Sequence, residues 1–174
     1  MDCHSKTYNL DEIPYEFHLL IRGSQSGFDR DAFWRFCDGC SNTVVVMRIR
    51  GSDEIIGGYN PLEWKSKKNS YLYTNNSFVF SLKNGEQNSI ISRLRNGQAS
   101  RAIYSSRAYG PRFARQDIFM ENNFNSKNCK CICESYEVPI RNTSEKFSVD
   151  EYEVFKVYKK FDVCSPTVYR PVVG

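Results

Sequence analysis

The sequence predicts a single, mainly β domain: a β-sandwich or a barrel with added helices. Its 174 residues suit one domain better than two. Hydrophobic residues make up 40% of the chain and aromatic residues 14%, so a sizeable core can form without disulfides or metal. Many short β-branched and aromatic segments, separated by glycine and asparagine turns, favour strands, and one early segment has clear helical periodicity.

The ends of the chain carry less pattern than its middle. We expect an N-terminal extension over 1–14, the domain over 15–160 and a C-terminal tail over 161–174. No signal-peptide pattern opens the sequence, and no apolar run approaches the ~20 residues of a membrane span. The seven cysteines are irregularly spaced, which argues against a secreted disulfide framework. A cytoplasmic protein without direct membrane insertion is therefore expected.

The first expected strand, Tyr15–Arg22, alternates between two faces. Three of its side chains are expected to face the core: Phe17, Leu19 and Ile21. Gly23 and Gly27 then predict a glycine-hinged turn, because glycine adopts backbone angles that other residues avoid.

A helix is expected to begin after Asp29, a good N-cap residue. Its apolar stripe has helical spacing and comprises Phe33, Phe36, Cys37 and Cys40. Cys37 and Cys40 have the spacing of a zinc half-site, and the 129–133 segment offers three further thiols. Burial as small apolar side chains explains the pair better than zinc or thiol-redox chemistry.

The remaining pattern is that of β-strands. The expected strands are Thr43–Ile49, Glu54–Tyr59, Ser77–Leu82, Ile90–Leu94, Ala102–Tyr104, Asp117–Met120 and Val149–Val157. The first two form a hairpin. Gly57 and Gly58 inside its second arm indicate a bulge, or a place where another group approaches the backbone closely.

The sequence contains no clear catalytic constellation. Its histidines are His4 and His18, and no nucleophile elbow, metalloprotease helix or phosphate-binding glycine loop is present. The carboxylates of Asp29 and Asp31 fit a helix N-terminus, and those of Glu151 and Glu153 fit an exposed strand face. We expect no catalytic residue, cofactor or metal. An enzyme or redox protein with an acid- or cysteine-based site remains the alternative.

Charge is unevenly distributed along the chain. The stretch between Glu86 and Asp117 contains six arginines and no acid, whereas acids predominate over 134–153. Either the two segments neutralise each other within the fold, or the basic one meets an acidic protein surface. Nucleic acid is disfavoured, since the net charge is only +4. The candidate interaction residues are Arg101, Arg107, Tyr109, Arg112, Phe113 and Arg115.

Five ordered blocks resemble the TLDc domain over about 15–158: "FHLLIRGSQSGFDRDAFWRFCDG", "TVVVMRIRGSDEIIGGYNPLEW", "SFVFSL", "YGPRF" with "QDIFM", and "FSVDEYEVFKV". The residues that match the family's motifs are Leu19, Leu20, Arg22, Gly23, Ser24, Gly27, Phe28, Gly57, Gly58, Tyr59, Trp64, Glu153, Val154 and Phe155. One block departs from the family: Ala114-Arg115-Gln116 stands where a glycine-rich stretch is usual, which adds bulk and charge to that loop.

The resemblance implies two antiparallel sheets in a sandwich flanked by short helices. It also implies a non-catalytic interaction module associated with resistance to oxidative stress and with binding the vacuolar-type proton-pumping ATPase. In many family members such a module follows other domains, so an adaptor fragment of a longer BTB-type protein is a further alternative. Within the domain, we expect the Arg22 guanidinium to bind the carboxylate of Glu153 or Glu151, which would tie the first block to the last.

Overall fold

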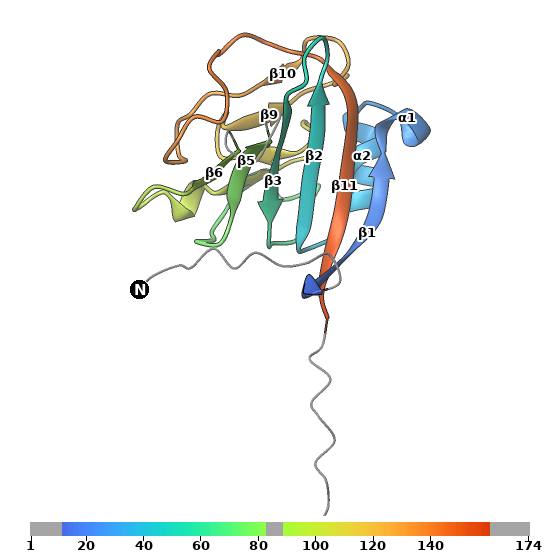
Figure 1. The fold of residues 1–174 in the computed structure, drawn as a ribbon. Coiled ribbons are helices and arrows are strands. Elements are labelled where there is room, and N and C mark those ends of the chain that lie inside the picture. Colours follow the sequence, from blue (N-terminus) through green and yellow to red (C-terminus); the bar gives the residue numbers. More distant parts are fainter. Residues whose placement is uncertain (1–11, 83–88, 161–174) are drawn as a thin grey trace, which may run out of the picture.

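Two antiparallel sheets pack face to face in the computed structural model, which describes residues 12–82 and 89–160 (Figure 1). The larger sheet has the strand order β1 (Tyr15–Arg22), β11 (Val149–Lys159), β2 (Thr43–Ile49), β3 (Ile55–Asn60), β5 (Phe78–Leu82) and β6 (Ile90–Arg93). The smaller sheet has the order β10 (Cys129–Lys130), β9 (Ile118–Met120), β8 (Arg112–Phe113), β7 (Ile103–Ser105) and β4 (Ser70–Leu72). The expected fold class is confirmed.

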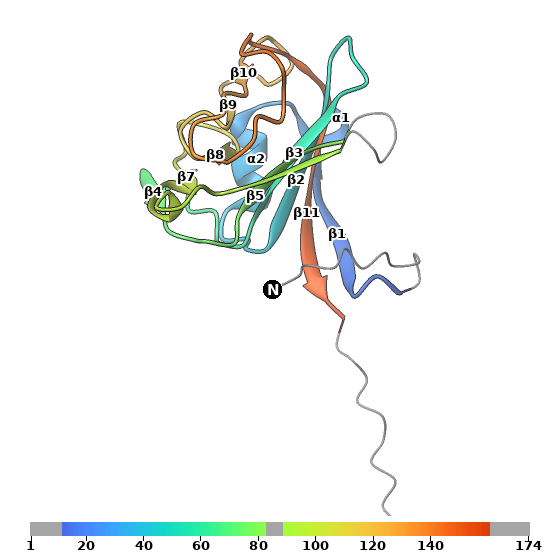
Figure 2. The same ribbon diagram turned by 60° about the vertical axis from the view of Figure 1, so that its left-hand side comes forward.

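Short helices lie between the strands: α1 (Gly23–Ser26), α2 (Arg30–Cys37) and the 3₁₀ helix η3 (Ala99–Arg101). The carboxylate of Asp29 caps α2 as expected, accepting the Ala32 N–H at 2.8 Å. The expected glycine turn is a single helical turn, ended by Gly27 at φ 115°. Helix α2 lies on the same side of the larger sheet as the smaller sheet (Figure 2).

The expected facing of the first strand is only partly right. Ile21 is buried, but Phe17 and Leu19 are 52% and 42% exposed. A β-bulge causes the difference: Leu19 pairs with Phe155 and Ile21 with Val154, so Leu20 is an extra residue that reverses the alternation. The bulge leaves Phe17 and Leu19 on the sheet face that points away from the smaller sheet.

The expected apolar stripe of α2 also needs correction. Phe33 and Cys37 are fully buried, whereas Phe36 is 40% exposed and Cys40 is half-buried. The helix ends at Cys37 with Asp38 as its C-cap, so Cys40 lies beyond the helix and does not extend its buried face.

The core centres on Trp64, which is fully buried between α2 and both sheets. Its ring makes edge contacts with Phe33 at 5.3 Å and Phe113 at 6.0 Å, and its Nε1 donates to Thr43 Oγ1 at 2.9 Å. The pairing of β2 with β3 is regular through Gly58. A Cβ there would lie 2.7 Å from the Phe113 ring, so close approach, and not a bulge, explains this glycine.

Candidate interaction surface

The outer face of the smaller sheet carries an arginine–aromatic cluster, which comprises Tyr104, Tyr109, Arg112 and Phe119. The Arg112 guanidinium carbon lies 4.4 Å from the Tyr104 ring centroid, 4.7 Å from Tyr109 and 5.0 Å from Phe119. Its Nε donates to the Arg115 carbonyl at 2.9 Å. The three rings therefore orient the half-buried Arg112 guanidinium through cation–π contacts.

Strand alternation positions this cluster. In β7, β8 and β9 the residues Ile103, Phe113 and Ile118 are fully buried, so their neighbours Tyr104, Arg112 and Phe119 point outward. Arg112 lies directly opposite Phe119 in the pairing of β8 with β9. The row continues into β4, where the Tyr71 ring lies 4.9 Å from that of Tyr104.

Phe113 is not an interaction residue, contrary to the sequence-based expectation. Its side chain is fully buried beneath Gly58 and Trp64. The sequence showed an aromatic residue among arginines, but the alternation of β8 sends Arg112 outward and Phe113 inward.

The other predicted arginines lie in segments adjacent in sequence to the strands that carry the cluster. Arg101 ends η3, Arg107 lies in the loop before β8, and Arg115 follows that strand; all three are exposed. Arg107 Nη2 lies 3.8 Å from Asp31 Oδ1, at a hollow of about 300 Å³ lined by residues of α2 and the loops beside it. Tyr109 anchors this loop, because its carbonyl accepts the Trp34 Nε1–H at 2.7 Å.

The loop after Phe113 keeps a glycine-like conformation without glycine. Ala114 adopts φ 50°, is fully buried, and donates its N–H to the Ala102 carbonyl at 2.8 Å. The side chain that Ala114 adds in place of a glycine therefore lies inside the fold. The added charge, that of Arg115, lies on the surface beside the cluster.

The acidic segment makes its ion pairs away from the arginine-rich one. Asp150 pairs with Arg50 at 2.8 Å, and Glu153 pairs with Arg22. Within residues 12–82 and 89–160, no ion pair joins an arginine of 93–115 to a carboxylate of 134–153. Direct ion pairs between the two segments therefore do not neutralise the arginine-rich surface.

The buried carboxylate of Asp117 joins the two segments through the backbone. It accepts the N–H groups of Glu134 at 2.9 Å, Ser135 at 3.1 Å and Tyr136 at 3.0 Å. Burial raises the pKa of Asp117 above its ordinary value, and the three N–H bonds oppose that rise. Asp117 thus holds the 134–136 segment beside the start of β9.

Two contributors to the surface, Tyr71 and Phe119, were missed by sequence reasoning. Tyr71 lies in β4, a three-residue strand that the sequence did not indicate. Phe119 lies in an expected strand, but its three residues are too few for a clear alternation. The available signal was local: Phe119 stands between two large apolar residues, Ile118 and Met120, both of which are fully buried.

The thiols of four described cysteines have raised pKa values. Burial raises the pKa of the Cys37 thiol above its ordinary range and that of Cys129 and Cys131 to about 12. Burial also raises the pKa of Cys133, against the lowering effect of Arg95, whose Nη2 lies 3.5 Å from its sulfur. Thiolate is scarce at such pKa values, which disfavours redox chemistry at these four positions. Over residues 12–82 and 89–160, no group of three His, Cys, Asp or Glu side chains could hold a metal ion.

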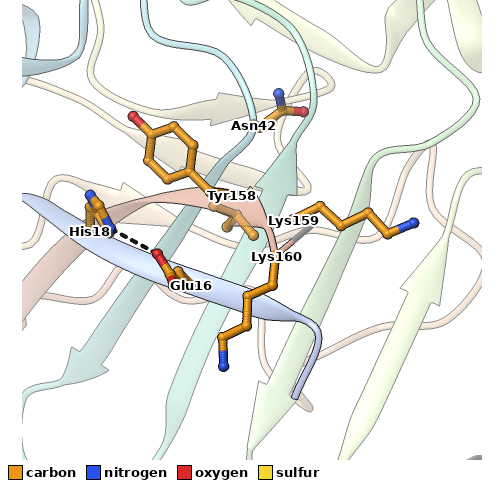
Figure 3. A pocket seen from close by; sticks show the side chains of 7 residues that line it. Glu16, His18, Asn42, Tyr158, Lys159 and Lys160 are labelled. Carbon is orange, nitrogen blue, oxygen red and sulfur yellow. Dashed lines mark ion pairs between the residues drawn. The ribbon is translucent and has the colours of Figure 1, made fainter. Parts of the chain in front are cut away.

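A hollow of about 910 Å³ lies where β1 begins and β11 ends (Figure 3). His18 Nε2 lies 3.5 Å from Glu16 Oε2, and both side chains are more than half exposed. The Tyr158 ring packs 4.8 Å from the imidazole. Lys159 and Lys160 point away from each other and from this pair, so the polar groups do not converge on a common point.

Several residues that match the family's motifs make structural contacts where β1 ends and α1 begins. The Arg22 Nε donates to Glu153 Oε1 at 2.5 Å, which is the expected ion pair. The Ser24 N–H donates to Glu151 Oε1 at 3.0 Å, so both candidate carboxylates hold this corner. A Cβ on Gly23 would lie 2.7 Å from the Tyr152 ring, which requires a residue without a side chain there.

The fold and this surface define a two-sheet β-sandwich domain with an arginine–aromatic face on its smaller sheet. The family model of the TLDc domain matches residues 5–158, so the chain belongs to the TLDc domain family. A search of the curated proteins returned no match. Across the described residues, no helix has the length and apolar character needed to cross a membrane.

Proposed function

We propose that this domain is a non-catalytic interaction module that binds an acidic protein surface through the arginine–aromatic cluster. The observation that carries the proposal is the Arg112 guanidinium held by three rings, with Arg101, Arg107 and Arg115 exposed in the neighbouring segments of the chain. Arginine with aromatic residues is typical of binding hot spots, and pre-oriented guanidinium groups favour carboxylate partners.

Membership of the TLDc family supports a more specific partner. The match to the TLDc family covers residues 5–158, and the resemblance to TLDc proteins implies a role in resistance to oxidative stress and in binding the vacuolar-type proton-pumping ATPase. We infer that this domain works in the cytoplasm and is recruited to organelle membranes by subunits of that pump. An acidic surface on a peripheral subunit would provide the carboxylates that the exposed arginines need.

Charge reversal tests this proposal. Arg101→Glu, Arg107→Glu and Arg115→Glu are made together, and binding to purified peripheral subunits of the proton pump is measured. We expect binding to weaken at least tenfold, since each reversal replaces attraction with repulsion at an exposed position. Lys146→Glu, Lys159→Glu and Lys160→Glu together make the matched control with the same change in net charge. Equal binding by both triple variants would show that the cluster is not the docking surface.

A further inference from the structure

Strand β1 is an exposed edge of the larger sheet (Figure 1). One side pairs with β11, and no strand within residues 12–82 and 89–160 pairs with the other. Such an edge presents a row of backbone N–H and C=O groups that can pair with another chain. The strand contains neither proline nor lysine, the residues that commonly block edge pairing.

The exposed part of β1 is a short segment with two distinct faces. On one face lie Tyr15, Phe17 and Leu19, each more than 40% exposed. On the other lie Glu16 and His18. The segment is bounded by Pro14, which has no backbone N–H, and by the bulge at Leu20. Five residues are therefore available for pairing, and Phe17 is their centre.

We propose that β1 pairs antiparallel with β1 of a second copy of this chain, centred on Phe17, so that two larger sheets become one. In this register Phe17 lies opposite the second copy's Phe17, and Tyr15 lies opposite its Leu19. Glu16 lies opposite its His18. On one face, apolar side chains of the two copies thus pack against each other. On the other face, the Glu16 carboxylate of each copy lies opposite the His18 imidazole of the other.

Charge selects this register over its neighbours. Registers that keep equivalent faces together must be centred on a residue, because side chains alternate along a strand. Centring on Glu16 places two carboxylates opposite each other, and centring on His18 does the same with two imidazoles. Like charges directly opposite are destabilising, and two opposed imidazoles lack the acid–base complementarity of Glu16 with His18. Among these three registers, only the one centred on Phe17 makes both polar pairs complementary.

The existing contacts of these polar side chains permit the new ones. The His18 imidazole lies 3.5 Å from its own Glu16 carboxylate and 4.8 Å from the Tyr158 ring, and His18 pairs with Lys156 of β11. Both Glu16 and His18 are more than half exposed, so each can turn toward a neighbouring copy. The arginine–aromatic cluster lies on the other sheet, so the dimer would not cover it.

Sedimentation of the full chain over a range of concentrations tests the dimer. We expect a monomer–dimer equilibrium whose dissociation constant rises roughly ten- to hundredfold in His18→Glu, because two acid–base pairs become two acid–acid pairs. Glu16→His combined with His18→Glu exchanges the two side chains and should restore dimerisation to within about threefold. A wild-type chain that stays monomeric at every soluble concentration overturns the proposal, as does a double exchange that stays as weak as His18→Glu.

Crosslinking tests the register independently. Directly opposite Cα atoms in an antiparallel pair are about 4.5–5.5 Å apart, within the range of a disulfide. Phe17→Cys should therefore give a covalent dimer under mild oxidation. Leu19→Cys, the matched control, faces the second copy's Tyr15 and should remain uncrosslinked. The unsubstituted chain, treated identically, accounts for the native cysteines. Crosslinking through position 19 but not 17 would contradict the register.

Discussion

The Arg22 guanidinium pairs with the Glu153 carboxylate at 2.5 Å, although 131 residues separate them in the sequence. The two residues also lie opposite each other in the pairing of β1 with β11. The same two residues are therefore joined by a side-chain ion pair and by the pairing of their strands, directly before α1 begins.

Breaking this pair should lower stability modestly. The Arg22 side chain is 40% exposed and that of Glu153 24%, so solvent screens part of their attraction. We expect Arg22→Ala to lower the free energy of unfolding by about 1 kcal/mol, between the values for exposed and buried pairs. Urea denaturation measures this, with Arg101→Ala as the exposed control. Equal midpoints for the two variants would show that the pair adds nothing to stability.

Gly57 should tolerate no side chain. A Cβ there would lie 2.1 Å from the Val45 carbonyl oxygen and 2.4 Å from the Phe80 ring. The backbone oxygen cannot move without disturbing β2, so Gly57→Ala should cost about 3 kcal/mol or more.

The matched control for Gly57 is Gly51→Ala. Nothing lies within 4 Å of a Cβ at Gly51, but its φ of 75° strains any other residue. That strain should cost about 1 kcal/mol. Thermal unfolding of the two variants compares them, and an equal loss would mean that steric overlap at Gly57 is relieved by small shifts.

The ion pair of Arg141 with Glu54 should behave as a buried pair. Only 8% of the Arg141 side chain is exposed; its Nε lies 3.0 Å from Glu54 Oε2, and its guanidinium lies 4.6 Å from the Phe147 ring centroid. Arg141→Ala leaves a largely buried carboxylate without its cation, so we expect a loss of about 3 kcal/mol.

Removing both charges of this pair should be much less harmful. Arg141→Met with Glu54→Leu keeps the volume and leaves no unpaired charge, so its unfolding free energy should lie within about 1 kcal/mol of wild type. Chemical denaturation measures the unfolding free energy of Arg141→Ala and of the double variant. A double variant as unstable as Arg141→Ala would show that packing of the guanidinium, and not its charge, stabilises this site.

Asp117 should make stability fall as the pH rises. Because burial raises the pKa of this carboxyl, the native chain keeps its proton at a pH where the unfolded chain has lost it. The stabilisation is complete below the unfolded pKa of about 3.9 and is lost as the pH rises through the higher native pKa.

Asp117→Asn removes this titration. The difference in unfolding free energy between wild type and variant should therefore shrink as the pH rises from about 4 through the native pKa. Urea unfolding at a series of pH values measures it. A difference that grows with pH would mean that the three backbone N–H bonds to the carboxylate outweigh its burial.

The longer strands could be predicted from the sequence because each buries a full alternating or apolar run. Thr43–Ile49 was expected with the bounds that β2 has, and the expected Val149–Val157 covers most of β11. The short strands β4, β8 and β10 were not predicted, because two or three residues carry no measurable periodicity. They exist because neighbouring strands and the core below hold them in place.

The site was predicted less well than the fold. The arginine-rich segment contains Arg112 and Tyr109, whose side chains are in contact in the structure, but sequence proximity wrongly included the buried Phe113. The rings that complete the cluster come from β7 and β9, and their pairing with β8 depends on tertiary structure. A bulge at Leu20 likewise has no local signal, which is why the exposure of Phe17 was not foreseen.

The place of β11 between β1 and β2 has a consequence for biosynthesis. Among the described residues the last strand in the sequence is an interior strand of the larger sheet, so the nascent chain cannot close that sheet until about residue 159 has left the ribosome. Until then β1 and β2 each present an open edge, and contacts between distant segments form late. Chaperones that shield such edges would matter most in that interval, and a message truncated before Val149 would yield a product prone to aggregation.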